Sequence, residues 1–255
     1  MDIFNPLFSI SLISPNKKRM ISKRPSSSRG KVDLGWLQSQ HSFSFGSYFD
    51  PNHMGYHQLR VINEDRVKAG SGFEPHRHRD MEIISYMIEG ELEHQDSLGN
   101  QDVIRVGEVQ RMTAGTGVVH SEYNPSNTSD NHFLQIWLYP DQKGLAPDYE
   151  QKFFGDPPWG DWRKVVSPTG DQGSLRINQQ ISIYDAKVEQ GKRLVFQNKL
   201  GQAYWLQLIL GELRLRNIEM RAGDGAAIMK EDIDFLSVLN SHLLLFELST
   251  ETGIN

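Results

Sequence analysis

Short segments rich in β-branched and aromatic residues, separated by glycine at regular intervals, constrain this chain more than any other feature. The stretch EIISYMIEGELEHQDSLGNQDVIRVGEVQRMTAGTG, from Glu82 to Gly117, divides into strands of about six residues with corners at Gly90, Gly99 and Gly107. The Gly99-Asn100 pair is typical of a tight hairpin turn. No long amphipathic helical pattern competes with these segments. The pattern predicts an all-β protein, built as an antiparallel sandwich or a small barrel.

The same pattern returns near the C-terminus, in YWLQLILGELRLRNIEMRAGDGAAIM. The Gly-Glu-Leu corner at Gly90 recurs at Gly211, 121 residues later, and Gly107 recurs as Gly223 after 116 residues. Two copies at such similar offsets indicate an internal repeat, and therefore two β domains. Between them, residues 141–165 are dense in proline, glycine and aromatic residues, which predicts a linker packed on the surface of both halves.

The composition excludes several classes of protein. The net charge of −5 is not that of a nucleic-acid binder, and no run approaches the ~18 uninterrupted apolar residues of a membrane span. The absence of cysteine rules out disulfides, thiolate ligands and a cysteine nucleophile. It also fits a reducing cytoplasm, where we expect the protein to be located. Any metal site must therefore use nitrogen and oxygen donors.

The first thirty residues differ from the rest of the chain. Residues 1–31 carry seven basic side chains against the single acidic Asp2, whereas acidic residues outnumber basic ones in the remainder. An apolar segment precedes these charges, which is the reverse of the order in a secretory signal. We therefore expect residues 1–30 to be a disordered extension, or to include residues upstream of a natural start at Met20.

Histidine is concentrated in one half of the molecule. Eight of the nine histidines lie between His41 and His132, and only His242 lies beyond them. In a strand, residues i and i+2 point to the same face of the sheet. His76 and His78, in EPHRHRDME, can therefore both point at one place inside a barrel.

The His120-x-Glu122 pair, in GVVHSEYN, repeats this spacing. Two such pairs on neighbouring strands supply three imidazole nitrogens and one carboxylate oxygen. That donor set suits a first-row divalent ion and leaves positions open for solvent or substrate. An H-x-H pair alone is common on protein surfaces, so the combination of both pairs carries the prediction of a metal site at His76, His78, His120 and Glu122.

The other histidines of the first half lack this pairing. His94, in LEHQDS, is expected to face solvent or to cap a turn. The remaining four are candidates for structural or supporting roles, and they are His41, His53, His57 and His132.

The second copy of the repeat has no counterpart of the four predicted ligands. When the repeat offsets are applied, the ligand positions fall near an amide, a lysine and two apolar residues, which are Gln197, Lys199, Leu236 and Val238. Such a set cannot hold a cation. The metal site is therefore expected only in the first domain.

At these residues the chain resembles a known family. GSGFEPHRHRDMEIISYMIEG, from Gly70, resembles the first cupin motif, and GEVQRMTAGTGVVHSEYN, from Gly107, resembles the second. Together with HSFSFGSYFDPNHMGY, QDSLGN and YEQKFF, they resemble the pirin family, whose members are two-domain cupins. The resemblance implies two tandem jelly-roll β-barrels, with residues 31–140 as the metal-binding cupin and residues 166–255 as a cupin without metal ligands.

The resemblance also implies how the metal is held. Pirins bind one metal ion, usually iron, through three histidines and one glutamate, which correspond to His76, His78, His120 and Glu122. Fe(II) is therefore the expected cofactor, with Mn, Co, Ni, Cu and Zn as alternatives that the ligand set does not separate. Glu82 matches the general cupin glutamate in position, and it is expected to lie beside the ligands and orient a histidine.

The family further implies an activity. Some bacterial pirins open the central ring of the flavonol quercetin with O2 and release carbon monoxide. A divalent ion would hold the deprotonated flavonol, and Glu122 would remove its 3-hydroxyl proton. Phe43, Phe45 and Met112 are expected to form apolar walls for the flat substrate. The alternative is an iron-containing regulatory protein that binds a transcription factor or a metabolic enzyme, and the sequence does not separate the two.

Overall fold

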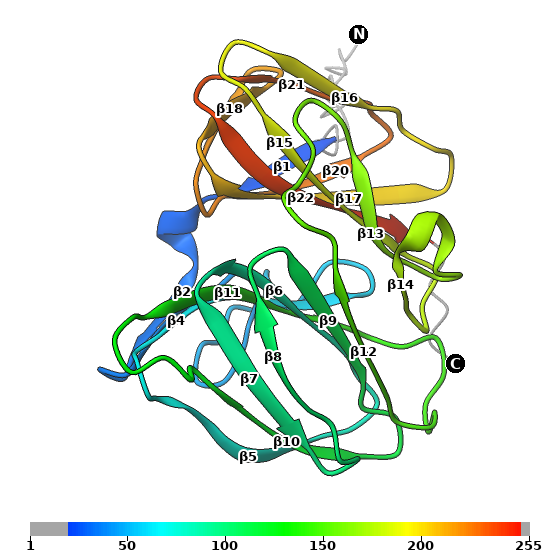
Figure 1. Cartoon of the computed structure of the whole chain (residues 1–255). Coiled ribbons are helices and arrows are strands. Elements are labelled where there is room, and N and C mark those ends of the chain that lie inside the picture. The colour runs from blue at the N-terminus through cyan, green and yellow to red at the C-terminus, as the bar shows by residue number, and fades with distance from the viewer. Residues whose placement is uncertain (1–19, 251–255) are drawn as a thin grey trace, which may run out of the picture.

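The chain folds into two β-barrels stacked on each other (Figure 1). The structure is a computed structural model, and it describes residues 20–250. Within that range the helical elements are two short 3-10 segments, Ser26–Ser28 and Asp171–Gly173. Neither is long or apolar enough to cross a membrane. The predicted all-β architecture of two tandem cupins is confirmed.

The first barrel combines a seven-stranded sheet with a four-stranded sheet. The larger sheet has the strand order β12-β9-β6-β11-β4-β3-β2, and the smaller has the order β5-β10-β7-β8. The strands are β2 (Gly30–Asp33), β3 (Leu37–His41), β4 (Leu59–Val67), β5 (Gly72–His78), β6 (Glu82–Glu89), β7 (Glu91–Asp96), β8 (Gln101–Arg105), β9 (Glu108–Thr113), β10 (Val118–Tyr123), β11 (Asn131–Leu138) and β12 (Asp148–Phe153).

The second barrel repeats this plan. Its larger sheet has the order β1-β20-β17-β22-β15-β13-β14, and its smaller sheet has the order β16-β21-β18-β19. The central strand β17 lies between β20 and β22 as β6 lies between β9 and β11, which confirms the internal repeat. The strands are β1 (Ile21–Arg24), β13 (Arg163–Ser167), β14 (Leu175–Arg176), β15 (Ser182–Val188), β16 (Arg193–Phe196), β17 (Gln202–Leu210), β18 (Glu212–Leu215), β19 (Ile218–Arg221), β20 (Gly225–Met229), β21 (Ile233–Ser237) and β22 (Ser241–Ser249).

Part of the expected N-terminal extension is ordered. β1 pairs with the edge strand β20 of the second barrel, so the prediction of disorder is wrong for residues 20–30. This edge would otherwise leave backbone N–H and C=O groups without partners. The segment is also held by Arg29, whose guanidinium is buried and lies 2.6 Å from a carboxylate oxygen of Glu64. Residues 1–19, and with them most of the predicted extension, lie outside the described residues.

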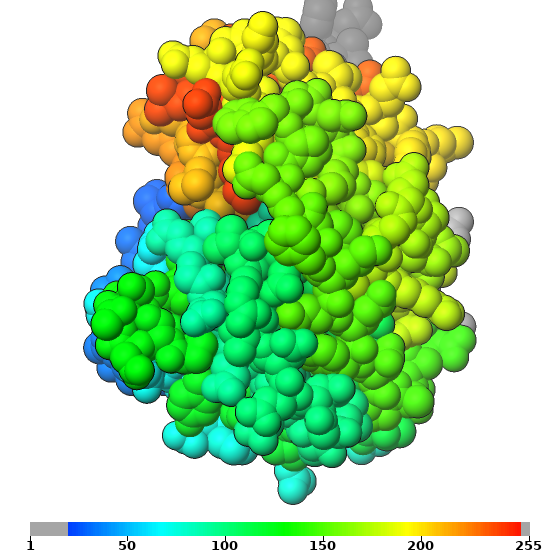
Figure 2. All heavy atoms as spheres, in the orientation of Figure 1, coloured from blue at the N-terminus to red at the C-terminus, as the bar shows by residue number. Residues whose placement is uncertain are grey.

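The predicted linker is partly a strand of the first barrel. β12 lies within residues 141–165 and pairs along its whole length with β9, so the first barrel extends to Phe153. The second barrel begins at Arg163, with β13. The segment between these two strands lies over the seam where the two lobes meet (Figure 2).

The largest hydrophobic core lies between the barrels. The two seven-stranded sheets face each other across it, with Ile84, Leu134 and Ile136 from the first barrel packing near Leu244 and Phe246 from the second. The alternate residues of the same strands face the interior of the first barrel instead. Both faces of this sheet are therefore buried, which explains why β6 and β11 read as nearly continuous apolar segments.

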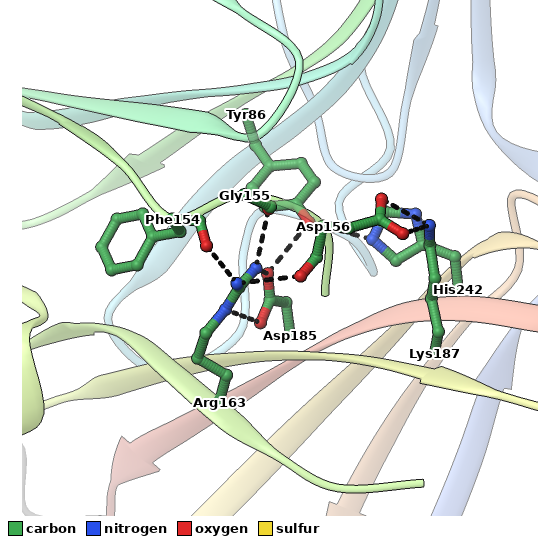
Figure 3. Close-up of polar contacts among 8 residues, drawn as sticks. All are labelled: Tyr86, Phe154, Gly155, Asp156, Arg163, Asp185, Lys187 and His242. Carbon is green, nitrogen blue, oxygen red and sulfur yellow. Dashed lines mark hydrogen bonds and ion pairs between the residues drawn. The ribbon is translucent and has the colours of Figure 1, made fainter. Parts of the chain in front are cut away.

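A buried polar network crosses the same interface (Figure 3). The Tyr86 hydroxyl, from the first barrel, lies 2.9 Å from His242 Nε2 and 3.2 Å from Asp185 Oδ2 of the second barrel. Arg163 forms two hydrogen bonds to Asp185, of 3.0 and 2.7 Å, and donates to the carbonyl oxygens of residues 154–156. These contacts fix how the barrels are oriented, because buried polar groups tolerate few alternative partners.

Candidate metal centre

Three histidines meet on two neighbouring strands of the four-stranded sheet. β10 pairs with β5 so that His120 lies directly opposite His76, and Val118 lies opposite His78. The ring centroids of His76 and His78 lie 4.4 and 4.8 Å from that of His120. One ligand atom from each of these histidines can be chosen so that all three atoms lie within 4.8 Å of one another. His76 and His78 therefore lie on the same face of their strand, as their i, i+2 spacing predicted.

The direction of the Glu122 side chain depends on a register shift in the same strand pair. The register shifts between His120 and Glu122, so that Ser121 of β10 faces both Glu74 and Pro75 of β5. Proline has no N–H to donate to the ladder, and an extra residue at such a position bends the strand. Glu122 then lies with His94 and His120 in a second group whose ligand atoms are within 4.8 Å of one another. His120 belongs to both groups.

The imidazoles are in a state that can bind a cation. Burial, reinforced by the neighbouring histidines, lowers the pKa of His78 and of His120 to about 3, so both rings are neutral near pH 7. His76 Nδ1 lies 2.8 Å from the carbonyl oxygen of Glu74, which can only accept, so His76 Nε2 keeps its lone pair. His120 Nε2 is buried and has no hydrogen-bond partner. A buried nitrogen without a partner beside two further imidazoles fits a single divalent metal ion.

Glu122 is held from the opposite sheet of the barrel. Its side chain is buried, and Gln135 Nε2 donates to both carboxylate oxygens at 3.0 and 2.9 Å. The Ser85 hydroxyl lies 3.4 Å from Glu122 Oε1. Gln135 and Ser85 are opposite one another on β11 and β6, so these two strands together orient the carboxylate.

His94 does not face solvent, and that prediction is wrong. β7 pairs with the other side of β10, which places His94 opposite Glu122 and Asp96 opposite His120 inside the barrel. The His94 side chain is fully buried, with Nε2 at 3.1 Å from Asp96 Oδ2 and Nδ1 at 3.4 Å from His120 Nδ1. The signal was present in the sequence, because His94-x-Asp96 has the same i, i+2 spacing as the two ligand pairs.

Glu82 does not orient a histidine. Its buried carboxylate accepts hydrogen bonds from Thr113, at 3.1 Å, and from the side-chain amide of Asn178 in the second barrel, at 3.3 Å. Even-numbered residues of β6, such as Ile84, face the second barrel, so Glu82 lies on the wrong side of the sheet to reach the histidines. Its burial raises its pKa.

A pocket of about 610 Å³ opens onto the centre, and all its lining residues belong to the first barrel. His76, His78 and Glu122 form part of its wall. Most of the remaining surface is apolar or aromatic, contributed by Val32, Leu34, Trp36, Leu37, Phe45, Phe73 and Trp137. Its volume lies in the usual range for small-molecule sites.

Of the three predicted wall residues, Phe45 lines this pocket, whereas Phe43 and Met112 do not. Phe43 points into the core between the barrels, where its ring centroid lies 4.8 Å from that of Trp205. Met112 is fully buried in a small cluster with Ile83. Phe43 and Phe45 are both apolar, so the sequence could not tell which of them faces a cavity.

The pocket also has a polar wall that the sequence did not reveal. His41 and Asn63 lie side by side on β3 and β4, with His41 Nδ1 at 2.8 Å from Asn63 Oδ1. His41 Nε2 and Asp65 Oδ1 are buried without hydrogen-bond partners. Burial is the main cause that raises the pKa of Asp65, to about 7, and it also lowers the pKa of His41.

The other histidines of the first half lie away from the centre. His132 Nε2 lies 3.0 Å from Glu64, and His53 Nδ1 lies 2.7 Å from Asp50. His57 has a positive φ of 52° and packs against Tyr56. Both groups of metal-ligating side chains found within residues 20–250 lie in the first barrel.

Comparison with known proteins gives matches to both barrels. A family model described as Pirin matches residues 22–138, and one described as Quercetinase C-terminal cupin domain matches residues 164–248. A protein of Escherichia coli K12 named quercetin 2,3-dioxygenase is 43% identical over 230 residues, which cover 90% of this chain and 99% of that protein. This chain belongs to the pirin family. The resemblance seen in the sequence is thereby confirmed.

Solved structures of other pirins are similar over nearly their whole length. YhhW of Escherichia coli matches with a TM-score of 0.87 and 42% identity, covering 90% of this chain and 97% of that one. The same bacterial pirin is known in complex with nickel(II), and that structure matches with a TM-score of 0.86, 42% identity, and coverage of 90% and 99%. A quercetin 2,3-dioxygenase of Acinetobacter baumannii shares the fold at 17% identity, with a TM-score of 0.75 and coverage of 89% and 85%.

Proposed function

We propose that this pirin is a metal-dependent dioxygenase that cleaves quercetin or a related flavonol with O2 and releases carbon monoxide. The observation that carries the proposal is the apolar pocket of about 610 Å³ whose wall includes His76, His78 and Glu122. The relatives named quercetin 2,3-dioxygenase support the same reaction. Fe(II) is the metal we expect, and the nickel(II) complex of YhhW supports binding of a divalent ion.

His76, His78, His120 and Glu122 are the proposed ligands. When bound, the ion would supply Lewis acidity that favours the deprotonated flavonol and its reaction with O2. Burial gives His78 and His120 a pKa of about 3, so these two imidazoles need not lose a proton to bind it. In His76 the hydrogen bond of Nδ1 to the Glu74 carbonyl directs Nε2 to the metal. The donors are oxygen and nitrogen only, in agreement with the absence of cysteine from the chain.

Glu122 is the proposed base for the 3-hydroxyl proton of the flavonol. Its carboxylate forms part of the pocket wall and can accept a proton while it remains hydrogen-bonded to Gln135. Gln135 limits the rotation of the carboxylate, so that one oxygen stays directed toward the substrate. A positioned carboxylate of this kind contributes about 10²–10⁴-fold to a rate.

The pocket is suited to a flat, hydroxylated ring system. Trp36 and Phe73 pack edge to face at 5.3 Å, and Phe45 packs in the same manner on Trp137 at 5.1 Å, so that rigid aromatic walls line the cavity. Walls of this kind exclude water from the reacting ring. His41 and Asp65 are proposed to bind hydroxyl groups of the flavonol, since each has a buried polar atom without a protein partner.

The pocket also favours the enzyme over the regulatory alternative. A protein that acted only through its surface would have no need of an apolar cavity of about 610 Å³ beside the proposed metal ligands, and such cavities are characteristic of small-molecule sites.

The test is anaerobic reconstitution with Fe(II), followed by addition of quercetin and O2, with carbon monoxide measured in the headspace. His76→Ala is the control, because it removes one proposed ligand from a half-buried position. Equimolar loss of quercetin and appearance of carbon monoxide, absent in the control, is the expected result. Full metal loading without carbon monoxide would reject the dioxygenase and return the regulatory function to first place.

A further inference from the structure

Both ring nitrogens of His94 are engaged by neighbours, and each neighbour restricts which nitrogen carries the proton. We propose that Asp96 and His94 form a relay that fixes the tautomer of His120, so that His120 Nε2 presents its lone pair to the metal. The relay rests on the proposed metal site and adds to it two positioning residues, which act through His120 and do not bind the metal themselves.

The relay starts at an ionised carboxylate with a full set of hydrogen bonds. Asp96 Oδ1 accepts from the backbone N–H groups of Leu98 and Asn100 at 2.9 and 3.1 Å. Asp96 Oδ2 accepts from Asn100 Nδ2 at 2.9 Å and faces His94 Nε2 at 3.1 Å. Burial opposes ionisation, but the hydrogen bonds from Asn100, His94 and Leu98 outweigh it and hold the pKa of Asp96 below its ordinary value.

The carboxylate dictates the state of His94. Asp96 Oδ2 already accepts from Asn100, and as a carboxylate oxygen it accepts from His94 as well, so the proton of the proposed His94 tautomer lies on Nε2. The other nitrogen, His94 Nδ1, then carries a lone pair. It faces His120 Nδ1 at 3.4 Å, and both side chains are buried. His94 therefore accepts from His120 rather than donating to it.

The state of His94 dictates that of His120. Because His94 Nδ1 accepts, the single proton of the neutral His120 ring lies on its Nδ1, and the lone pair lies on Nε2. That nitrogen is the buried atom without a protein partner beside His76 and His78. With the opposite tautomer, His120 would present an N–H to the metal and could not bind it.

This geometry explains why His94 is itself no ligand, although it groups with His120 and Glu122. Its Nε2–H faces Asp96, and its lone pair, on Nδ1, faces His120, so no lone pair is free for a metal. Tyr149 of β12 closes the outer side, with its ring centroid 5.0 Å from that of His94. The strand within the predicted linker thus contributes to the burial of the relay.

Asp96→Asn reverses the relay while hardly changing its shape. The two backbone N–H groups at Oδ1 hold the amide oxygen of the new side chain on that side. The NH2 group must then take the place of Oδ2 and donate to His94 Nε2. The side-chain amide of Asn100, which donates to Oδ2 in the unmodified chain, must turn so that its oxygen accepts from the new NH2 group. His94 would carry its proton on Nδ1, and His120 would be driven to the Nε2-protonated tautomer.

The first measurement is the tautomer of each ring in the metal-free protein, from the ¹⁵N chemical shifts and long-range ¹H–¹⁵N couplings of labelled histidine. In the unmodified chain we expect a protonated Nδ1 on His120 and a protonated Nε2 on His94. In Asp96→Asn both assignments should be exchanged. This readout needs neither bound metal nor activity, and a purely structural role of Asp96 would not change it.

The second measurement is the affinity for Ni(II), by competition with a chelator. Loss of a group that orients a metal-binding histidine typically costs about 10–100-fold in affinity, and we expect a loss of this size for Asp96→Asn. Asp102→Asn is the matched control, because it makes the same change of charge on an exposed residue of the next strand. It should leave both the tautomers and the affinity unchanged.

Three outcomes would overturn the relay: a protonated Nε2 on His120 in the unmodified chain, a doubly protonated His94, or a folded Asp96→Asn protein with unchanged tautomers and Ni(II) affinity. The tautomer measurement on the unmodified chain tests the relay even if the Asp96→Asn variant does not fold. Failure of the dioxygenase would appear separately, as metal binding without release of carbon monoxide and with the expected tautomers intact.

Discussion

Gln135 Nε2 lies 3.0 and 2.9 Å from the two carboxylate oxygens of Glu122, and this contact joins the two sheets of the first barrel across its interior. Gln135 belongs to β11 of the seven-stranded sheet, whose other face packs on the second barrel. Glu122 belongs to β10 of the four-stranded sheet. The orientation of the proposed base therefore depends on a strand that is fixed in place by the second barrel.

Gln135→Leu should weaken the centre without removing a ligand. The Glu122 carboxylate would lose its main hydrogen-bond donor, and we expect the affinity for Ni(II) to fall by about tenfold or more. Titration of the metal-free protein with Ni(II) measures the effect. Gln110→Leu is the control, because Gln110 is equally buried but its amide atoms have no hydrogen-bond partner. An equal loss in both variants would show that the effect comes from general disruption of the barrel.

His120→Ala and Glu122→Gln should separate metal binding from proton transfer. His120→Ala removes a ligand, so we expect loss of most bound metal, with an unchanged β-sheet circular dichroism spectrum. Glu122→Gln keeps the size and one oxygen donor but cannot take a proton, so kcat should fall by about 10²-fold or more while much of the metal remains. Elemental analysis and quercetin consumption measure the two quantities. Unchanged turnover in Glu122→Gln would remove this residue as the base.

Phe43→Ala should mainly affect stability and Phe45→Ala should mainly affect substrate binding, although the residues are two positions apart. Phe43 is buried against Trp205 between the barrels, so its loss should lower the free energy of unfolding by about 3–5 kcal/mol. Phe45 lines the pocket, so its loss should mainly raise KM for quercetin. Urea unfolding and steady-state kinetics distinguish them. A large change of KM in Phe43→Ala with unchanged stability would contradict the assignment of the two faces.

His242 should make the interface sensitive to acid. Burial lowers its pKa from 6.5 to about 4. Between these values the unfolded chain binds a proton and the folded chain does not, so the free energy of unfolding falls as the pH drops from about 7 to 4. The shift corresponds to about 3 kcal/mol at the lower end.

His242→Gln isolates this contribution, because glutamine can still bond to the Tyr86 hydroxyl but does not titrate. We expect the free energy of unfolding of the variant, measured in urea, to depend less on pH than that of the unmodified chain between pH 7 and 4.5. Above pH 7 the free energies of unfolding of the variant and of the unmodified chain should change with pH at the same rate. Parallel curves over the whole range would show that His242 is protonated in the folded state or contributes nothing.

The ligand pairs could be found from the sequence because they depend on local geometry. Residues i and i+2 share a face in any strand, so His76 with His78 and His120 with Glu122 needed only the prediction of two strands. The same rule applies to His94 and Asp96, whose i, i+2 spacing also places both side chains on one face of their strand. Glu82 shows the limit of the rule, because it begins a strand whose two faces are both buried and the spacing did not tell which one it joins.

The all-β class, the two copies of the barrel and the confinement of histidine pairs to the first copy follow from the order of the residues, since strand period, glycine corners and repeats are properties of neighbouring residues. The packing of the strands was needed to show that Gln135 holds Glu122, that His94 faces His120, and that Phe43 and Phe45 lie in different compartments. These contacts join strands far apart in the chain, and they depend on the register and stacking of sheets that form only when both barrels pack together.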